Sequence, residues 1–417
     1  MQKSKIINDP VYGFIQIPEG ILLDLINHPY FQRLSRIKQV SLAHYVYPGA
    51  HHTRFHHALG ALHLMQEALS ILTSKGIEIT PSEQTSACIA ILLHDIGHGP
   101  FSHTLENTLI KVSHEKLSIA FMEALNITFE GKLTEAISIF RRTHPKYFLS
   151  QLVSGQFDVD RLDYLSRDSF FTGVTEGVVG YSRIIKMLSV SDGALVVEEK
   201  GIYSVEKFLI ARRLMYWQVY LHKTVLAAEN MLIKIIERAR ILHKRNQLQY
   251  IPSSLKYFMD NDITEDHLSE NALFLLDKFA ALDDIDIFSA IKEWQNEEDL
   301  LLAFICKSLL NRELFKLKFS DVPISEERLL MEKSNLKNWW KGSDEEMSFL
   351  LFSGKESNRA YSYAQEEIKI LTKEGVVKPM SDCVDYPLPP GGIEKYYLCY
   401  ASELKEKDAL IGKRRCF

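Results

Sequence analysis

Paired cysteines and long apolar runs, two features of secreted and membrane proteins, are scarce or missing here. The 417 residues include only five cysteines, an odd number, and none stands in a CxxC spacing. This usage excludes a disulfide framework and a thiolate metal site. No apolar run approaches the ~20 residues that cross a bilayer, and the opening MQKSKIINDPVYGF lacks a signal peptide's apolar stretch. These absences predict a cytoplasmic protein with no membrane partner.

An excess of positive charge is also missing. Lysine and arginine number 49 against 54 aspartates and glutamates, which gives a net charge of −5. Nucleic-acid binding usually needs a basic face, so we expect no nucleic-acid partner. With 46% hydrophobic and 25% charged residues, the chain can bury a sizeable core.

Apolar residues recur at helical spacing over most of residues 20–320, which predicts a mostly α fold. We expect one broken or two short helices at 20–39, a long helix ending on Gly76, and a buried helix from Ser82. Further helices are expected at 113–125, 132–140, 145–153 and 204–246. Small β excursions are expected at GFIQIP and at ALVVEE-KG-IYSV (194–205), the latter turning at Lys-Gly. More turn residues and aromatic-rich segments near residue 320 predict a main domain over 1–321 (core about 50–230) and an α+β appendage over 322–417.

Histidines are concentrated in one part of the chain. Ten of the 15 lie between His44 and His114, and LLHDIGHGPFSH places three of them directly after an apolar helix. An imidazole and a carboxylate there, His94 and Asp95, cost several kcal/mol unless they are paired or coordinated. A divalent cation satisfies both groups, because it binds neutral imidazole and carboxylate together.

Further metal ligands must come from neighbouring helices. RFHHALG offers His56 or His57, and FDVDRLDYLSRDSF (157–170) crowds four aspartates and two arginines into one segment. Two histidines and two aspartates with open positions make a catalytic rather than a closed structural site.

These motifs resemble those of a known family. The order RFHHALG, HDIGHGPFSH, His114-Glu115 and DVDRLDYLSRD is similar to the H…HD…D signature of the HD-domain metal-dependent phosphohydrolases. The likeness is strongest to the deoxynucleoside triphosphate triphosphohydrolase branch, includes PYFQRLSRIKQV and RRLMYWQVYLHK, and covers about residues 8–320. It implies an HD-domain helical bundle and a homo-oligomer (dimer or tetramer), here without the SAM domain of one branch member.

The resemblance also implies the chemistry and its residues. One divalent ion (Mn, Fe, Mg or Zn) activates a water that attacks the α-phosphorus of a nucleotide substrate, releasing deoxynucleoside and triphosphate. The implied metal ligands are His57, His94, Asp95 and Asp160. The implied phosphate and sugar contacts are Arg54, Arg161, Tyr164, Asp168, Arg212 and Tyr220. The implied catalytic residues are His98, His103 and His114, with His103 as the proton donor, oriented by Glu106 or Glu115.

Several positions depart from the family pattern. Asn27 and Ser35 replace an Asp and an Arg that recognise an activating guanine nucleotide, which argues against that form of activation. Position 161 is commonly Lys in the family, and Tyr216 and Trp217 replace a His-Arg pair.

Two alternatives to dNTP hydrolysis stay open at this point. One is a phosphatase or phosphodiesterase of the same family that acts on another nucleotide. The other is a nucleotide sensor that keeps the fold without catalysis.

Overall fold

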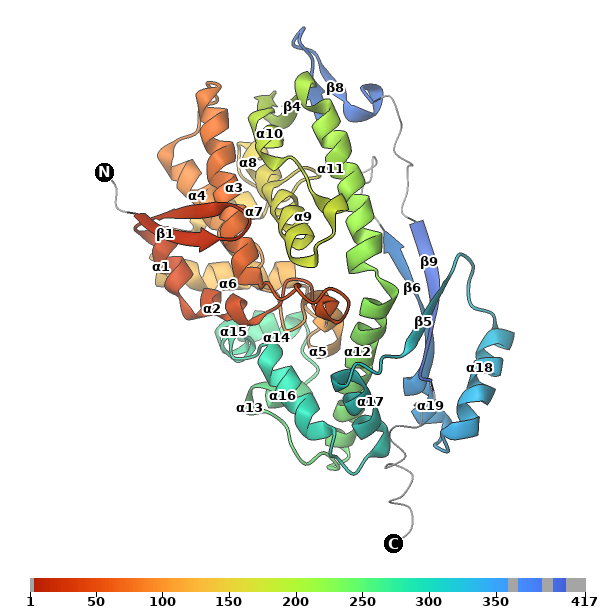
Figure 1. Ribbon diagram of the computed structural model, residues 1–417. Coiled ribbons are helices and arrows are strands. Elements are labelled where there is room, and N and C mark those ends of the chain that lie inside the picture. Colours follow the sequence, from red (N-terminus) through yellow and green to blue (C-terminus); the bar gives the residue numbers. More distant parts are fainter. Residues whose placement is uncertain (1–3, 359–366, 385–392, 403–417) are drawn as a thin grey trace.

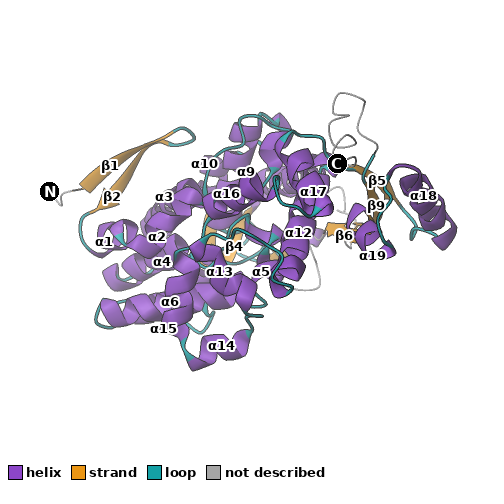
Figure 2. Ribbon diagram, turned by 90° about the horizontal axis from the view of Figure 1, so that it is seen from below, coloured by secondary structure: helices purple, strands orange, loops and turns teal. Residues whose placement is uncertain are grey.

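Helices dominate the structure, a computed structural model that describes residues 4–358, 367–384 and 393–402 (Figures 1 and 2). The helices before the histidine-rich turn are α1 (Ile21–Asn27), α2 (Pro29–Gln32), α3 (Arg54–Ser74) and α4 (Pro81–Leu93). The central helices are α5 (Glu106–Leu109), α6 (His114–Thr128), α7 (Thr134–Phe140), α8 (Tyr147–Val153), α9 (Val159–Thr172), α10 (Tyr181–Lys186), α11 (Ile202–Met215) and α12 (Lys223–Lys244). The later helices are α13 (Ser253–Asp260), α14 (Glu265–Glu270), α15 (Ala272–Ala280), α16 (Asp284–Trp294), α17 (Leu300–Leu310), α18 (Glu326–Trp339) and α19 (Asp344–Leu350). The predicted mostly α fold with small β parts is confirmed.

Three small sheets complete the described part of the chain. An N-terminal hairpin pairs β1 (Ser4–Asp9) with β2 (Gly13–Pro18), which confirms the strand predicted at GFIQIP. A second sheet has the order β3 (Leu188–Ser191), β4 (Ala194–Glu198), β7 (Lys369–Leu371) and β8 (Val377–Pro379). A third has the order β5 (Lys316–Ser320), β9 (Ile393–Tyr400) and β6 (Leu351–Asn358), and packs on α12.

The hairpin predicted at 194–205 was wrong in its second half. IYSV begins α11, and β4 pairs instead with the preceding strand β3. The two strands join at Asp192-Gly193, where both residues have positive φ (50° and 74°), as a tight hairpin turn requires. At the predicted Lys-Gly turn Gly201 has φ −90° and leads into the helix.

The domain boundary predicted at residue 321 stays a prediction. Strands from the two sides of residue 321 pair with each other in two of the sheets. β7 pairs with β4 in parallel, and β5 pairs with β9 across the same point. Parts of the predicted appendage, at 359–366, 385–392 and 403–417, lie outside the described residues.

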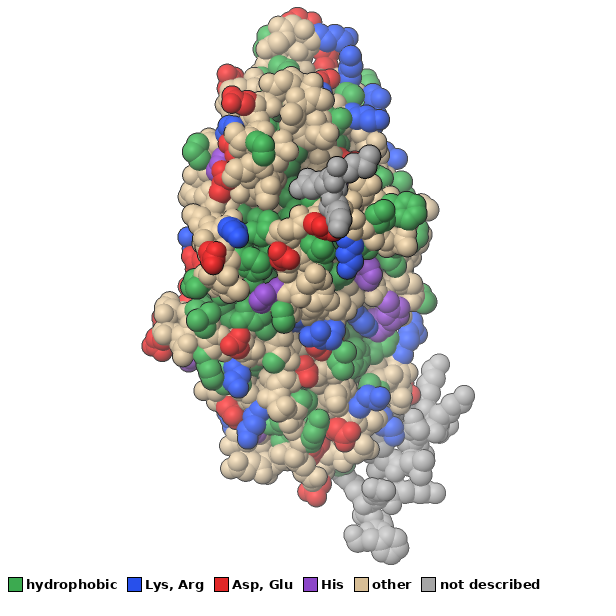
Figure 3. Space-filling model, turned by 90° about the vertical axis from the view of Figure 1, so that its left-hand side faces the viewer, with side chains coloured by type: hydrophobic (Ala, Val, Ile, Leu, Met, Phe, Trp, Pro, Cys, Tyr) green, Lys and Arg blue, Asp and Glu red, His purple; other side chains and the backbone are tan. Residues whose placement is uncertain are grey.

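Charges of both signs are mixed on the face drawn in Figure 3. There lysines and arginines are interspersed with aspartates and glutamates, and no extended patch of one sign covers the face. Within the described residues, no helix combines the length and apolarity needed to cross a membrane.

Helix α3 packs against both α4 and α9 in the core, and these three helices carry the site. The two helices α3 and α9 approach closely at Gly60. A Cβ there would lie 2.0 Å from Asp163 Oδ1 and 2.1 Å from Arg167 Nη2, so only glycine fits.

Replacing Gly60 by Ala is expected to lower the free energy of unfolding by about 1–3 kcal/mol, because the added methyl overpacks a buried ion pair. Urea denaturation measures the change. Gly180→Ala is the matched control, since no atom lies within 4 Å of a Cβ at that position. Equal midpoints for both variants and the wild type would show that α3 and α9 are not in close contact.

Candidate metal centre

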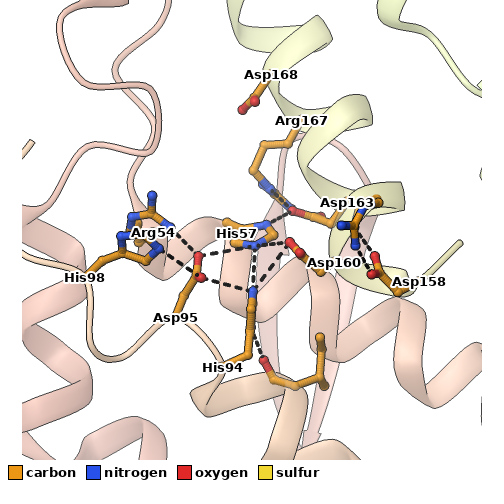
Figure 4. Close-up of polar contacts among 12 residues, drawn as sticks. Arg54, His57, His94, Asp95, His98, Asp158, Asp160, Asp163, Arg167 and Asp168 are labelled. Atoms are coloured by element: carbon orange, nitrogen blue, oxygen red, sulfur yellow. Dashed lines mark hydrogen bonds and ion pairs between the residues drawn. The ribbon is translucent and has the colours of Figure 1, made fainter. Parts of the chain in front are cut away.

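Four side chains from three distant segments point at one another where the ends of α3, α4 and α9 meet (Figure 4). His57 lies in the first turns of α3, and His94 caps the C-terminus of α4 with Asp95 next to it. Asp160 lies in the first turn of α9, where the helix dipole favours a carboxylate. The structure therefore brings together all four residues expected as metal ligands.

The ligand atoms lie close to one another. His57 Nε2 is 3.2 Å from His94 Nε2 and 3.1 Å from Asp160 Oδ1. His94 Nε2 is 3.5 Å from Asp160 Oδ1 and 3.3 Å from Asp95 Oδ1. The neighbouring His56 is not part of this group, and its Nδ1 accepts from the backbone N–H of Thr53.

The outer ring nitrogens of the two histidines show which way their lone pairs point. His57 Nδ1 lies 2.7 Å from Asp163 Oδ2, and His94 Nδ1 lies 2.6 Å from the carbonyl of Ile91. A carboxylate and a carbonyl can only accept, so both Nδ1 atoms donate and the two Nε2 atoms of neutral rings carry lone pairs.

Two lone pairs and two carboxylates facing one another in a buried space repel unless a cation lies between them. Two nitrogens about 2.1 Å from one ion stand about 3.0–3.4 Å apart, which matches the 3.2 Å separation of the two Nε2 atoms. The residues present therefore fit a divalent metal ion. HD domains bind such ions, and the identity of the ion here is open.

The pKa shifts of the clustered side chains also indicate a negative electrostatic potential at this site. Burial lowers the pKa of His57, but Asp160 and Asp163 outweigh it and raise the pKa to about 10. Burial raises the pKa of Asp95, but Arg54 and His94 bring it well below its ordinary value. The centre attracts positive charge strongly, although its side chains are buried.

A chain of buried ion pairs holds His57 from behind. Asp163 accepts from His57 Nδ1 and from Arg167 Nε at 3.0 Å, and Arg167 Nη1 reaches Asp9 Oδ2 at 2.8 Å. Asp163 was not among the metal ligands or contacts predicted from the sequence. Its spacing on one helix, three residues after Asp160 and four before Arg167, is the signal that could have found it.

Arg54 and His98 flank Asp95 on its other side. Arg54 Nη1 donates to Asp95 Oδ2, and Arg54 Nε donates to Ser102 Oγ at 2.8 Å. His98 Nε2 lies 3.4 Å from Asp95 Oδ1, and burial lowers the pKa of His98 well below its ordinary value, with Arg54 adding to the shift.

The three histidines expected at the phosphate path form a cluster. The rings of His98 and His114 stack with their centroids 4.0 Å apart, and His103 meets both rings edge-on. Glu106 binds two of them, His103 Nδ1 at 3.1 Å and His114 Nδ1 at 2.9 Å. Glu115 is exposed and, within the described residues, shows no hydrogen bond to any of the three.

A cavity of about 560 Å³ adjoins the metal cluster at Asp160. Arg161 and Arg212 line it, and the buried Nε atom of each has no hydrogen-bond partner among the described residues. Buried N–H donors are normally satisfied, so these two point to an anionic ligand in the cavity.

The remaining predicted contacts line the same cavity. Asp168 accepts from Tyr220 OH at 2.6 Å, and its other oxygen lies 2.6 Å from His52 Nε2. Tyr164 stands beside Tyr220, with ring centroids 6.1 Å apart. His52 was not among the predicted contacts, because nothing in the sequence distinguishes it from its neighbour His51.

The chain is similar to several known proteins. Residues 54–168 match the HD domain, and residues 179–266 match the HD associated region. The uncharacterized protein YwfO of Bacillus subtilis is 30% identical over 397 residues, which are 91% of this chain and 88% of that protein. The crystal structure of a phosphohydrolase from Bacteroides thetaiotaomicron is 48% identical, with a TM-score of 0.92 over 96% of this chain and 100% of that one.

A second group of relatives matches only in part. The deoxynucleoside triphosphate triphosphohydrolase SAMHD1 homolog of Dictyostelium discoideum is 32% identical over 254 residues. The match covers 55% of this chain and 48% of that protein, so the chain spans about half of that relative's length.

Asp163→Asn is expected to weaken divalent metal binding about 10–100-fold, because an amide no longer fixes the orientation and tautomer of His57. The affinity is measured by titrating the folded variant with Mn²⁺ against a competing chelator. Asp266→Asn, an exposed change in the first turn of α14, is the control. Wild-type affinity in Asp163→Asn would show that Asp163 does not support a metal ligand.

Glu106 is expected to make stability depend on pH. Burial tends to raise the pKa of Glu106, but hydrogen bonds from His103 and His114 outweigh it and place the pKa far below the ordinary 4.5. Since the folded pKa lies below the unfolded one, the ionised carboxylate stabilises the fold above about pH 4.5, and this contribution is lost as the pH falls.

The difference in unfolding free energy between the wild type and Glu106→Gln is therefore expected to be largest near neutral pH and to shrink below about pH 4.5. Urea titrations at several pH values measure it, with Glu115→Gln as the exposed control. A difference that does not change with pH would contradict the assignment.

Proposed function

The chain belongs to the HD-domain phosphohydrolases, and from this premise we propose that it hydrolyses deoxynucleoside triphosphates to deoxynucleoside and triphosphate. We propose one divalent ion, bound by His57, His94, Asp95 and Asp160. The relatives named as deoxynucleoside triphosphate triphosphohydrolases support this choice of substrate.

The observation that carries the proposal is the continuity of the cavity. It begins at Asp160, passes the unsatisfied guanidinium nitrogens of Arg161 and Arg212, and includes the buried carboxylate of Asp168. This lining fits a ligand with an anionic group to pair with the arginines and a hydroxyl group to donate to Asp168. A nucleotide has both features.

The bound ion supplies Lewis-acid chemistry, since it lowers the pKa of a water and neutralises charge on a phosphoryl oxygen. The chain's own residues bind and orient the phosphates. Arg54 holds Asp95 in place, while Arg161 and Arg212 place fixed positive charge along the triphosphate, which phosphoryl transfer needs more than covalent help.

Proton transfer to the leaving oxygen falls to the histidine cluster. Glu106 binds His103 at Nδ1, which leaves Nε2 of that ring free to carry the proton. His98 and His114 complete the wall around it.

At the sugar, Asp168 accepts a hydrogen bond from a ribose hydroxyl. Tyr220 and His52 hold the carboxylate in position. Tyr164 packs beside the ring and crowds the 2′ position, which favours a deoxyribose.

Three broader expectations belong to the same proposal. They are a main unit over residues 1–321, a homo-oligomer of two or four chains, and a cytoplasmic location. Analytical ultracentrifugation of the purified chain measures the second.

Purified protein with Mn²⁺, Fe²⁺ or Mg²⁺ is expected to release deoxynucleoside and intact triphosphate from at least one dNTP. Asp160→Ala is expected to reduce turnover to background, because a metal ligand is lost. Arg212→Ala is expected to lower kcat/KM about 10²–10³-fold, as for other losses of a fixed charge at a reacting group. Anion-exchange chromatography identifies and quantifies the products.

Arg213→Ala is the matched control, because this neighbouring arginine on α11 is exposed. Release of orthophosphate alone, or turnover only of another nucleotide, would replace the proposal by a related phosphatase or phosphodiesterase. Nucleotide binding without turnover under any metal would identify a sensor.

A further inference from the structure

The cavity extends beyond the elements of the HD domain to the C-terminal sheet. Glu229 on α12, Glu356 on β6 and Tyr397 on β9 line the same cavity as Asp160 and Arg212. The β5–β9–β6 sheet packs on α12, and Figures 1 and 2 place this sheet and α9 to different sides of that helix. The sheet therefore forms part of the wall of the substrate cavity.

The two glutamates put uncompensated acid groups into this wall. Neither Glu229 nor Glu356 forms an ion pair among the described residues, although many other surface acids of the chain do. Lys395 stands opposite Glu356 in the strand register, but its Nζ lies 4.7 Å from the centroid of the Trp217 ring. The cation nearest in register is thus directed to an aromatic ring.

The environment of the pair makes both carboxyl groups costly to keep charged. Burial raises the pKa of Glu229 to about 7, and Glu356 adds to the shift against hydrogen bonds from Ser41 and Thr104. Burial also raises the pKa of Glu356. Acid groups kept in a cavity at such a cost are candidates for ligand recognition.

A second observation, which does not depend on the two glutamates, supports a ligand site in this cavity. Only 5% of Arg212 is exposed, and its Nε has no hydrogen-bond partner among the described residues. At about 560 Å³ the cavity lies within the roughly 300–1,000 Å³ of small-molecule sites. Its volume and its unsatisfied donor are independent of the two glutamates.

We propose that Glu229 and Glu356 read the base of the nucleotide and select bases with an exocyclic amino group over thymine. This inference rests on the proposed function for the identity of the substrate. Adenine, cytosine and guanine each present an amino group that donates to a carboxyl oxygen. Adenine and cytosine carry this group at N6 or N4 and guanine carries it at N2, whereas thymine has carbonyl oxygens, O4 and O2, at both corresponding positions, and these repel a carboxylate.

The neighbours of the pair strengthen the assignment to the base. Tyr397 OH donates to Asn230 Oδ1 at 3.2 Å, and Asn230 Nδ2 donates to the carbonyl of Leu226 at 2.8 Å. Both side chains are thus engaged with protein partners. Glu229 also accepts from Ser41 and Thr104, so the carboxyl group of Glu356 and the remaining acceptor capacity of Glu229 are left for a ligand in the cavity.

The first test compares kcat/KM for the four dNTPs. The wild type is expected to favour dATP, dCTP and dGTP over dTTP by at least about tenfold, the discrimination of one good base contact. Glu356→Gln and Glu229→Gln are expected to reduce that ratio several-fold, because a glutamine amide can donate to a thymine carbonyl. Glu394→Gln is the control, since this β9 residue is exposed and pairs with Lys355.

The second test is independent of hydrolysis. Calorimetric binding of the four deoxynucleosides is expected to show the same order, with thymidine weakest, and Glu356→Gln is expected to level it. If no dNTP is hydrolysed but this order holds, the proposed function fails and the base selection stands.

Several results would overturn the base selection while leaving hydrolysis intact. These are equal kcat/KM for all four dNTPs in the wild type, and an equal fall for all four in the glutamine variants. Equal binding of the four deoxynucleosides, or none, would overturn it as well.

Discussion

Two imidazole lone pairs and two carboxylates that face one another inside a protein need a cation, and much of this fold serves to hold them there. The four side chains come from the ends of three helices, which is where a backbone can bring residues 57, 94 and 160 into contact. Each imidazole is fixed by a hydrogen bond at its outer nitrogen, one to Asp163 and one to a backbone carbonyl. Since those bonds determine where the lone pairs point, they determine the metal centre as much as the ligands do.

The support for this arrangement reaches far along the chain. Asp163 is neutralised by Arg167, and Arg167 also binds Asp9 at the end of the N-terminal hairpin. The close approach of α3 and α9 that permits these contacts requires glycine at position 60. The N-terminal strand that carries Asp9 and the glycine at position 60 of α3 thus both contribute to the position of the His57 ring.

The cavity beside the metal cluster is assembled in the same way from parts of the chain that are remote in sequence. Its wall includes residues from Gln39 near the N-terminus to Tyr397 on the last strand. The HD-domain segment supplies the metal cluster and Arg161, the HD associated region supplies Arg212 and Glu229, and the C-terminal sheet supplies Glu356. The proposed base selection would thus depend on an α+β segment that has no catalytic motif of its own.

The sequence alone determined the helical fold and the cluster of histidines, because helical periodicity and local motifs are properties of short segments, and the family resemblance supplied the four candidate ligands. It could not determine the residues that act through others. The roles of Asp163 and His52 become visible only once α9 lies against α3. The composition placed the hairpin turn at Lys200-Gly201, whereas the chain turns earlier, at Asp192-Gly193. Glu229 and Glu356 are separated by more than a hundred residues and have no shared motif. Only tertiary packing brings them into one cavity, because burial and the distance between charges are properties of the folded chain.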